Sequence, residues 1–195
     1  MTGVQTCALP ISNNTTGSNL TAVGYRALYS NNNATNPNTA IGSECLFSNT
    51  SGYSNVAVGI YALRSNPSGT NNVAMGRDAL YYNTSGASNT AIGDSALISN
   101  PTASNNTAVG YQAGYSNTTG AGNIFAGMYA GRSNTTGLCN SFVGGVDGYG
   151  AGHSNTTGNY NTAIGTAALG LNTTDRKSTR LNSSHVSESR MPSSA

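Results

Sequence analysis

His153 is the residue whose chemistry most suggests catalysis, because an imidazole can exchange a proton near neutral pH. It is the one histidine among residues 13–174, and Asp147 is the one carboxylate near it in the sequence. A Ser-His-Asp site needs its base held by an acid, and the other carboxylates are scattered along the chain. We therefore expect no catalytic residues and no enzymatic activity.

The glycine-rich segment that ends at His153 could instead hold a metal or a cofactor. It reads GGVDGYGAGH over residues 144–153. A glycine-rich calcium motif has to recur about every nine residues to build its sites, and this one occurs once. A dinucleotide fingerprint needs a surrounding βαβ pattern, which the sequence lacks. We expect no metal and no cofactor here, and two interpretations stay open: a protruding loop that makes binding contacts, or a tolerated insertion.

Aromatic residues and arginines recur at two positions that we expect to face outward. The first follows an anchor glycine and holds Tyr25, Ser43, Ile60, Arg77, Asp94, Tyr111 and Met128. The second holds Tyr29, Phe47, Arg64, Tyr81, Ile98, Tyr115 and Arg132. Such a stripe is suited to stacking against glycans or protein, and equally to packing between copies of the chain. The sequence leaves both open.

A repeat of 17 residues positions all of these side chains. Its anchor, Asn-Thr/Val-Ala-Val/Ile-Gly, ends at Gly24, Gly42, Gly59, Gly76, Gly93, Gly110, Gly127, Gly144 and Gly165. The spacing is 18 residues, then 17 six times, then 21. An Ala-Leu pair follows most anchors, and an Asn-Thr-Thr/Ser-Gly turn comes next. A fixed period in this range indicates a repeat architecture.

Each part of the repeat predicts a local structure. The residues around Ala-Val-Gly have the length and branching of a strand, and Ala-Leu with its neighbour predicts a second short strand. Asn, Thr, Ser and Gly supply the turns, and stacked turns would let each Asn bond to its counterpart in the next coil. We predict an all-β fold: a parallel β-solenoid (β-roll) of about nine 17-residue coils over residues 13–174.

Both faces of the anchor strand are apolar, which favours self-association. Neighbours such as Ala57 and Val58 point to opposite faces of a strand, and the two positions are almost always Ala and Val or Ile. A single chain would enclose one of these faces, so we expect partner chains to bury the other. The sequence alone predicts an oligomer without fixing its number.

Two coils depart from this pattern in a compensating way. Phe125 replaces the usual alanine, and Gly114 and Gly131 replace the usual leucine. We hypothesise that Phe125 and Phe142 fill the space that those leucines would occupy. Elsewhere, Cys45 and Cys139 lie more than five repeats apart.

That separation rules out a disulfide in a stacked solenoid. It corresponds to roughly 25 Å at ~4.8 Å per coil, whereas a disulfide needs Cα atoms within about 7 Å. We therefore expect Cys45 and Cys139 to be small buried residues.

Both ends of the chain read as translated sequencing-library adapter. Residues 2–11 are TGVQTCALPI and residues 175–185 are DRKSTRLNSSH, and both match the translation of a common short-read adapter pair. We assign residues 1–12 and 175–195 to adapter and expect 175–195 to be disordered. The genuine segment is then 13–174, an insert open at both ends.

Removing the adapter removes the basic charge. The whole chain carries a net charge of +2, but residues 13–174 hold four arginines against four carboxylates. Arg26, Arg64, Arg77 and Arg132 thus offset Glu44, Asp78, Asp94 and Asp147. This balance argues against nucleic acid as a partner, and no apolar run reaches the length of a membrane span.

The Asn-Thr/Val-Ala-Val/Ile-Gly anchors resemble the head repeats of YadA-type trimeric autotransporter adhesins. They are equally similar to repeats of phage-like tail fibres, and the resemblance covers residues 13–174. It implies a left-handed parallel β-roll, a side-by-side homotrimer, and an extracellular place on a bacterial surface (outer membrane) or a virion tail fibre. The 17-residue unit is longer than the usual adhesin head repeat, and Ala-Leu-x-Ser-Asn-Thr-Thr-Gly is more typical of tail fibres.

This resemblance predicts a structural and binding region, the head or shaft of an adhesin or tail fibre that attaches to a host surface protein or glycan. No direct membrane insertion is expected for the fragment. A passive spacer shaft without a ligand is one alternative. Ice binding is another, since Thr21, Thr39, Thr90, Thr107 and Thr162 recur at one position, although Val56, Val73, Ile124 and Ser141 interrupt the row.

Overall fold

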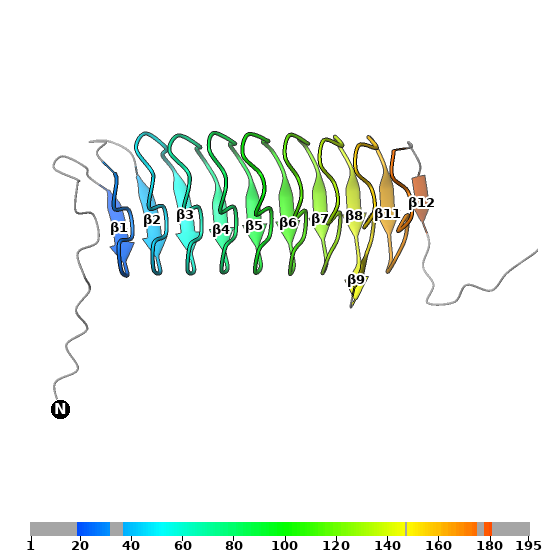
Figure 1. Ribbon diagram of the computed structural model, residues 1–195, viewed down its shortest axis with the longest axis horizontal. Helices are drawn as coiled ribbons and strands as arrows, with labels where there is room; N and C mark the ends of the chain where they lie inside the picture. Colours follow the sequence, from blue (N-terminus) through cyan, green and yellow to red (C-terminus); the bar gives the residue numbers. More distant parts are fainter. Residues whose placement is uncertain (1–18, 32–36, 147, 175–177, 181–195) are drawn as a thin grey trace, which may run out of the picture.

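The computed structural model describes residues 19–31, 37–146, 148–174 and 178–180. Its elements are strands stacked in one row (Figure 1). The strands are β1 (Leu20–Val23), β2 (Asn38–Ile41), β3 (Asn55–Val58), β4 (Val73–Met75), β5 (Thr90–Ile92), β6 (Thr107–Val109), β7 (Ile124–Ala126), β8 (Ser141–Val143), β9 (Gly145–Val146), β10 (Tyr149–Gly150), β11 (Thr162–Ile164) and β12 (Ser178–Arg180).

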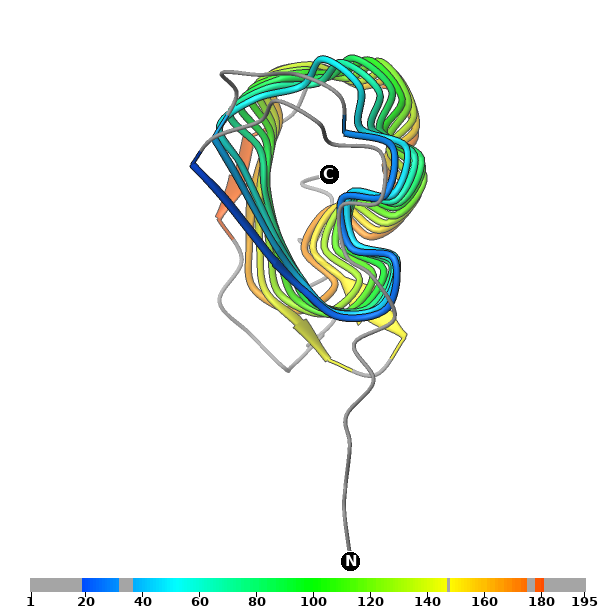
Figure 2. The same ribbon diagram turned by 90° about the vertical axis from the view of Figure 1, so that its left-hand side faces the viewer.

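The repeat becomes a parallel β-solenoid, as predicted. Strands β1 to β8, β11 and β12 form one parallel sheet in chain order. Equivalent repeat positions lie opposite each other, so Ala57 pairs with Ala40 on one side and with Ala74 on the other. The nine anchor strands, β1 to β8 and β11, bound eight turns of the described solenoid. Seen along its axis, the sheet forms one side of each coil and turn segments form the other (Figure 2).

The strand alternation decides which apolar position faces the core. Ala57, Ala74 and Ala91 are fully buried. Their neighbours point outward: Met75 is 42% and Ile92 38% exposed. The small inner residue suits a narrow coil, because the leucine of the Ala-Leu pair fills the core from the opposite side. The larger aliphatic side chain is left on the outer face of the sheet.

The second short strand that we predicted at Ala-Leu is wrong: this segment is a series of turns. Ala79 and Leu80 are both fully buried, whereas consecutive side chains of a strand point to opposite faces. The backbone buries both side chains by alternating between left- and right-handed conformations: φ is positive at Asp78 (57°) and Leu80 (52°) but not at Ala79 between them. It still bonds between coils, since the Leu80 N–H donates to the Ala96 carbonyl (3.0 Å).

The anchor glycines mark a place where backbones of successive coils approach closely. Gly76 has a φ of 131°, and a Cβ there would lie 2.6 Å from the Gly93 carbonyl oxygen. Most of the column repeats this contact: a Cβ on Gly59 would lie 2.6 Å from the Gly76 oxygen. Only glycine combines this backbone conformation with the absence of a side chain.

Two ladders of buried asparagines tie the coils together, which confirms the predicted ladder and adds one that was not anticipated. The predicted ladder uses turn residues and runs through Asn31, Asn49, Asn66, Asn83, Asn100, Asn117, Asn134, Asn155 and Asn172. The second uses the anchor asparagines: Asn72 Nδ2 donates to Asn55 Oδ1 (3.2 Å) and to the Gly86 carbonyl (2.8 Å). Its Oδ1 in turn accepts from the backbone N–H of Asn89 (2.9 Å). Among the described residues, Asn31 Nδ2 at the start of the first ladder is the one buried side-chain nitrogen or oxygen without a partner; the other buried amides are satisfied, as burial requires.

The volume compensation is confirmed for Phe125, whereas Phe142 fills a different space from the one predicted. A Cβ on Gly114 would lie 2.5 Å from Phe125 Cδ2, and a Cβ on Gly131 would collide with the same ring. Phe142 fills the corresponding space at Gly152, a third leucine-to-glycine exchange that we did not identify from the sequence. The two rings continue the core, with centroids 6.0 Å apart.

The cysteine prediction holds for one residue and is wrong for the other. Both thiols are free, and Cys45 is buried, but Cys139 is exposed. Cys139 occupies a left-handed turn position (φ 53°) just before the buried Asn140, where Ser88 and Asn105 occur in other coils. The residue follows the requirements of that turn and not those of the core.

The adapter assignment falls almost wholly outside the described residues, namely on 1–12, 175–177 and 181–195. Disorder was expected over 175–195, but Ser178–Arg180 form β12 and pair with β11. No further anchor strand follows β11, so the edge of β11 is open to pairing, and such an edge readily takes up an extended segment such as β12. The origin of both ends remains a prediction.

Candidate functional site

The outer face of the sheet carries an apolar row beside a partly polar one. In the first row Val23, Ile41, Met75, Ile92, Val109, Val143 and Ile164 are 38–51% exposed. The second row is the threonine position of the repeat, and the structure places Thr90 and Thr107 side by side on the same face. Val56 and Val73 continue that row. The face is therefore repetitive and mostly apolar.

A second column lies on the side of the coil opposite the sheet (Figure 2). It follows the buried leucine position and contains Tyr29, Phe47, Arg64, Tyr81, Ile98, Tyr115 and Arg132, all of them half-buried. His153 is the next member, because Ala151-Gly152-His153 takes the place that Ala130-Gly131-Arg132 has one coil earlier. The sequence analysis did not assign His153 to this column, because it counted positions from the anchor glycine and four extra residues follow Gly144. Counting from the alanine would have revealed it.

Arginine and aromatic rings stack along this column. The Arg64 guanidinium lies 5.1 Å from the Phe47 ring centroid and 5.7 Å from that of Tyr81. Its Nε donates to Glu44 Oε2 at 2.7 Å. The hydrogen bond to that carboxylate raises the pKa of Arg64. This charge is thus matched within the protein.

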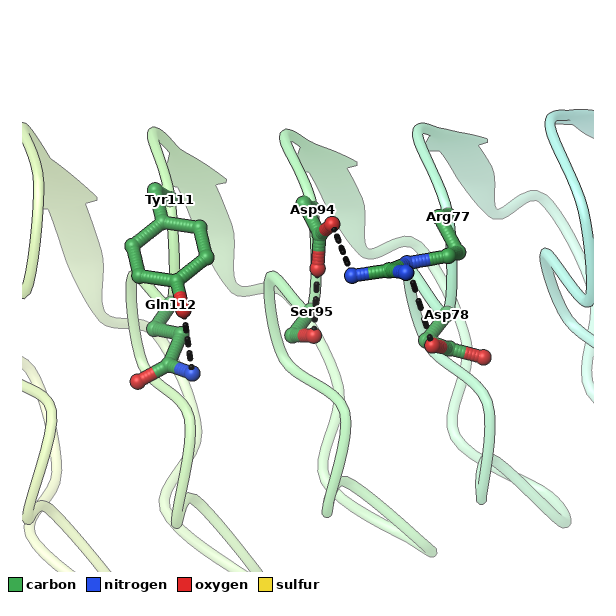
Figure 3. A network of polar contacts seen from close by, with 6 residues as sticks. All are labelled: Arg77, Asp78, Asp94, Ser95, Tyr111 and Gln112. Atoms are coloured by element: carbon green, nitrogen blue, oxygen red, sulfur yellow. Dashed lines mark hydrogen bonds and ion pairs between the residues drawn. The ribbon is translucent and has the colours of Figure 1, made fainter.

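The charge of Arg77 is likewise paired with carboxylates (Figure 3). Its Nη2 donates to Asp94 Oδ2 at 2.7 Å, and its Nε lies 3.7 Å from Asp78 Oδ2. Ser95 Oγ donates to the other Asp94 oxygen at 2.7 Å. The Arg77–Asp94 pair bridges adjacent coils at an exposed surface, where such an ion pair contributes at most about 1 kcal/mol.

Arg132 differs from both. Its Nε donates to the neutral Gln112 Oε1 at 3.0 Å, and its guanidinium lies 5.4 and 5.5 Å from the centroids of Tyr115 and Tyr129. Gln112 is itself held by a hydrogen bond from its Nε2 to the Tyr111 hydroxyl (3.1 Å; Figure 3). No carboxylate in the described part of the chain pairs with Arg132.

The glycine-rich segment next to Arg132 forms a protruding hairpin, a shape that fits both a binding loop and a tolerated insertion. Strands β9 and β10 pair antiparallel and project from the coil (Figures 1 and 2). Glycine is required at their bases, since a Cβ on Gly145 would collide with the Met128 carbonyl and one on Gly150 with the Tyr129 carbonyl. The hairpin therefore lies directly against the preceding coil.

Two clefts flank this hairpin and share His153. The first has a volume of about 230 Å³ and is lined by Tyr129, Arg132, Gly148 and His153. The second, of about 650 Å³, is lined by Tyr149, His153, Ser154, Ala167, Gly170 and Leu171. Burial lowers the pKa of His153, and the nearby Arg132 charge adds to this effect.

No metal-binding cluster appears in the part of the chain that the structure describes. Three or more His, Cys, Asp or Glu side chains do not gather anywhere among those residues. Asp147, the one acid that the sequence places near His153, lies outside them. The same residues include no helix long and apolar enough to cross a membrane.

A scan against protein-family models, a search of curated proteins and a search of solved structures each found no match to this chain.

Proposed function

We propose that residues 13–174 are a structural and binding repeat region, the head or shaft of a surface-exposed trimeric adhesin or tail fibre. The region would stand outside the cell, on a bacterial surface or a virion, and attach to a host protein or glycan. It would perform no catalysis. The observed β-solenoid supports the structural half of this proposal, since stacked coils make a stiff and extensible rod.

The exposed apolar row on the sheet is the observation that supports self-association, and the number three follows from the resemblance of the repeats. An extended apolar patch of this kind marks an interaction surface, and each Å² removed from water contributes about 25 cal/mol. The row repeats with the period of the coil, so an identical row on another chain matches it along the whole length. Packing through the sheet also leaves the Arg-aromatic column and the hairpin open to a partner.

Sedimentation analysis of the 195-residue chain tests this arrangement. We expect three times the chain mass, and we expect the double variant Met75→Asp, Ile92→Asp to give a monomer with an unchanged β-type circular dichroism spectrum. Tyr82→Asp is the matched control, because Tyr82 is 56% exposed in the coil of Met75 but lies outside the sheet. A wild-type monomer, or any other stable stoichiometry, would overturn the trimer.

Ice binding remains the second candidate because the threonine row lies on the outer face of the sheet. Thr90 and Thr107 are adjacent there, but Val73, Ile124 and Ser141 interrupt the row. Thermal hysteresis of a solution of the chain would support this function, and ordinary freezing would exclude it. A passive spacer instead predicts a trimer that retains no immobilised glycan or protein.

A further inference from the structure

We propose that the cleft between the β9–β10 hairpin and the Arg132–His153 pair binds the carboxylate of an acidic sugar. The proposal names a ligand for the attachment function proposed above and rests on it in that respect. The cleft of about 230 Å³ is of the size of one sugar ring, and Tyr129, Arg132, Gly148 and His153 line it.

The charges around the cleft call for an anion. Arg64 and Arg77 each bond to a carboxylate at 2.7 Å, whereas Arg132 has a neutral amide partner and no acid among the described residues. His153 follows it in the same column and supplies an imidazole N–H as a second donor group. Guanidinium and carboxylate form strong paired hydrogen bonds because their geometries match.

The guanidinium is held in place before any ligand arrives. Its Nε is bonded to Gln112, and the rings of Tyr115 and Tyr129 lie within 5.5 Å of its central carbon. Each of these contacts leaves the terminal amino groups available. A group ordered in advance loses less entropy on binding, which favours affinity.

The hairpin supplies the surface that a sugar ring would contact. Tyr149 is 65% exposed and lines the adjoining cleft together with His153. An aromatic ring beside a polar site suits a ligand with one apolar and one polar side, as a sugar has. The insertion thus adds an aromatic group to the adjoining cleft, which shares His153 with the first.

The binding experiment uses sodium glucuronate as the probe, with glucose as its neutral counterpart and acetate as the bare carboxylate. The chain has two histidines, His153 and His185, so ring-proton NMR gives one reporter at the cleft and one internal control. We expect glucuronate to shift the His153 resonances in a saturable way and to leave those of His185 unchanged. Glucose should have no effect, and acetate should bind at least tenfold more weakly.

Variants separate the proposal from its alternatives. Arg132→Gln should weaken glucuronate binding about tenfold or more, and Tyr149→Ala should weaken glucuronate but not acetate. Equal binding of glucose, unchanged affinity in Arg132→Gln, or equal binding of acetate would each overturn the assignment. Binding that appears only in Asp147→Asn would also overturn it, because the loop's own carboxylate would then occupy the site.

Sedimentation of the same samples keeps the two proposals apart. A trimer that fails to bind glucuronate contradicts the acidic-sugar site alone. A monomer that binds it contradicts the trimer and leaves the site intact.

Discussion

The packing of Phe125 against glycines predicts a strong energetic coupling between two coil positions. Phe125 stands where other coils have alanine, and its ring fills the leucine space at Gly114 and Gly131. Phe125→Ala should lower the free energy of unfolding by about 3–5 kcal/mol, the usual cost of removing a buried phenylalanine. Gly131→Leu alone should cost about 1–3 kcal/mol or more through overpacking.

The double variant Phe125→Ala, Gly131→Leu should cost far less than the sum of the two. Independent effects would add to about 4–8 kcal/mol, but the new leucine takes the space that the ring vacates, so we expect a loss of about 1–2 kcal/mol. Backbone strain does not oppose this: φ is 58° at Gly131, and Leu80 and Leu97 already occupy this position at 52° and 49°. The remaining loss reflects the empty space at Gly114.

Urea denaturation of the four proteins, followed by circular dichroism at one fixed chain concentration, gives the coupling energy. Because a solenoid can unfold in parts, hydrogen exchange of the Gly114 and Gly131 amides provides a local check; both donate to the next coil at 2.9 Å. A double variant destabilised by the full sum, within about 0.5 kcal/mol, would refute the shared-space explanation.

Three further substitutions test the other contacts between coils. Gly76→Ala should lower the free energy of unfolding in urea by more than ~2 kcal/mol, because its Cβ meets a carbonyl oxygen of the next coil. Gly148→Ala is the control for backbone strain alone, because a Cβ at Gly148 has nothing within 4 Å. Asn72→Ala should lose about 3 kcal/mol in the same assay, since the buried Asn89 N–H loses its acceptor, and Asn55 Oδ1 and the Gly86 carbonyl each lose one of two donors. Burial raises the pKa of Cys45 from 9.0 to about 11. The thiol therefore ionises at lower pH in the unfolded chain than in the folded one, and the free energy of unfolding should fall between pH 9 and 11. Cys45→Ala, measured at the same pH values, should lack that part of the fall, and an identical pH profile would contradict it.

Periodicity predicted the solenoid because every stacked position has to satisfy the same neighbours. The in-register pairing of Ala57 with Ala74 is a direct consequence, and so is the asparagine ladder. The phenylalanine compensation was predictable for the same reason: a volume gained at Phe125 had to be lost within reach, and Gly131 was the missing volume.

The second segment of the coil could not be predicted by strand rules. Two consecutive apolar residues such as Ala79 and Leu80 suggested a strand, but a narrow coil buries both and therefore alternates left- and right-handed backbone conformations. Strand patterns describe residues with one preferred backbone region. A leucine at φ 52° lies outside that assumption. It is tolerated because bonds to the next coil replace those of a strand.

The location of the insertion explains why the candidate site was only partly visible in the sequence. The four extra residues lie between Gly144 and Ala151, on the outside of the coil, and the core positions before and after them keep their stacking partners. Gly131 N–H still donates to the Ala151 carbonyl (2.9 Å). The solenoid can therefore carry a new loop at this point without losing a buried contact. That loop lies beside Arg132, whose charge no described acid matches, so the inserted loop and an arginine without an acid partner line the same cleft.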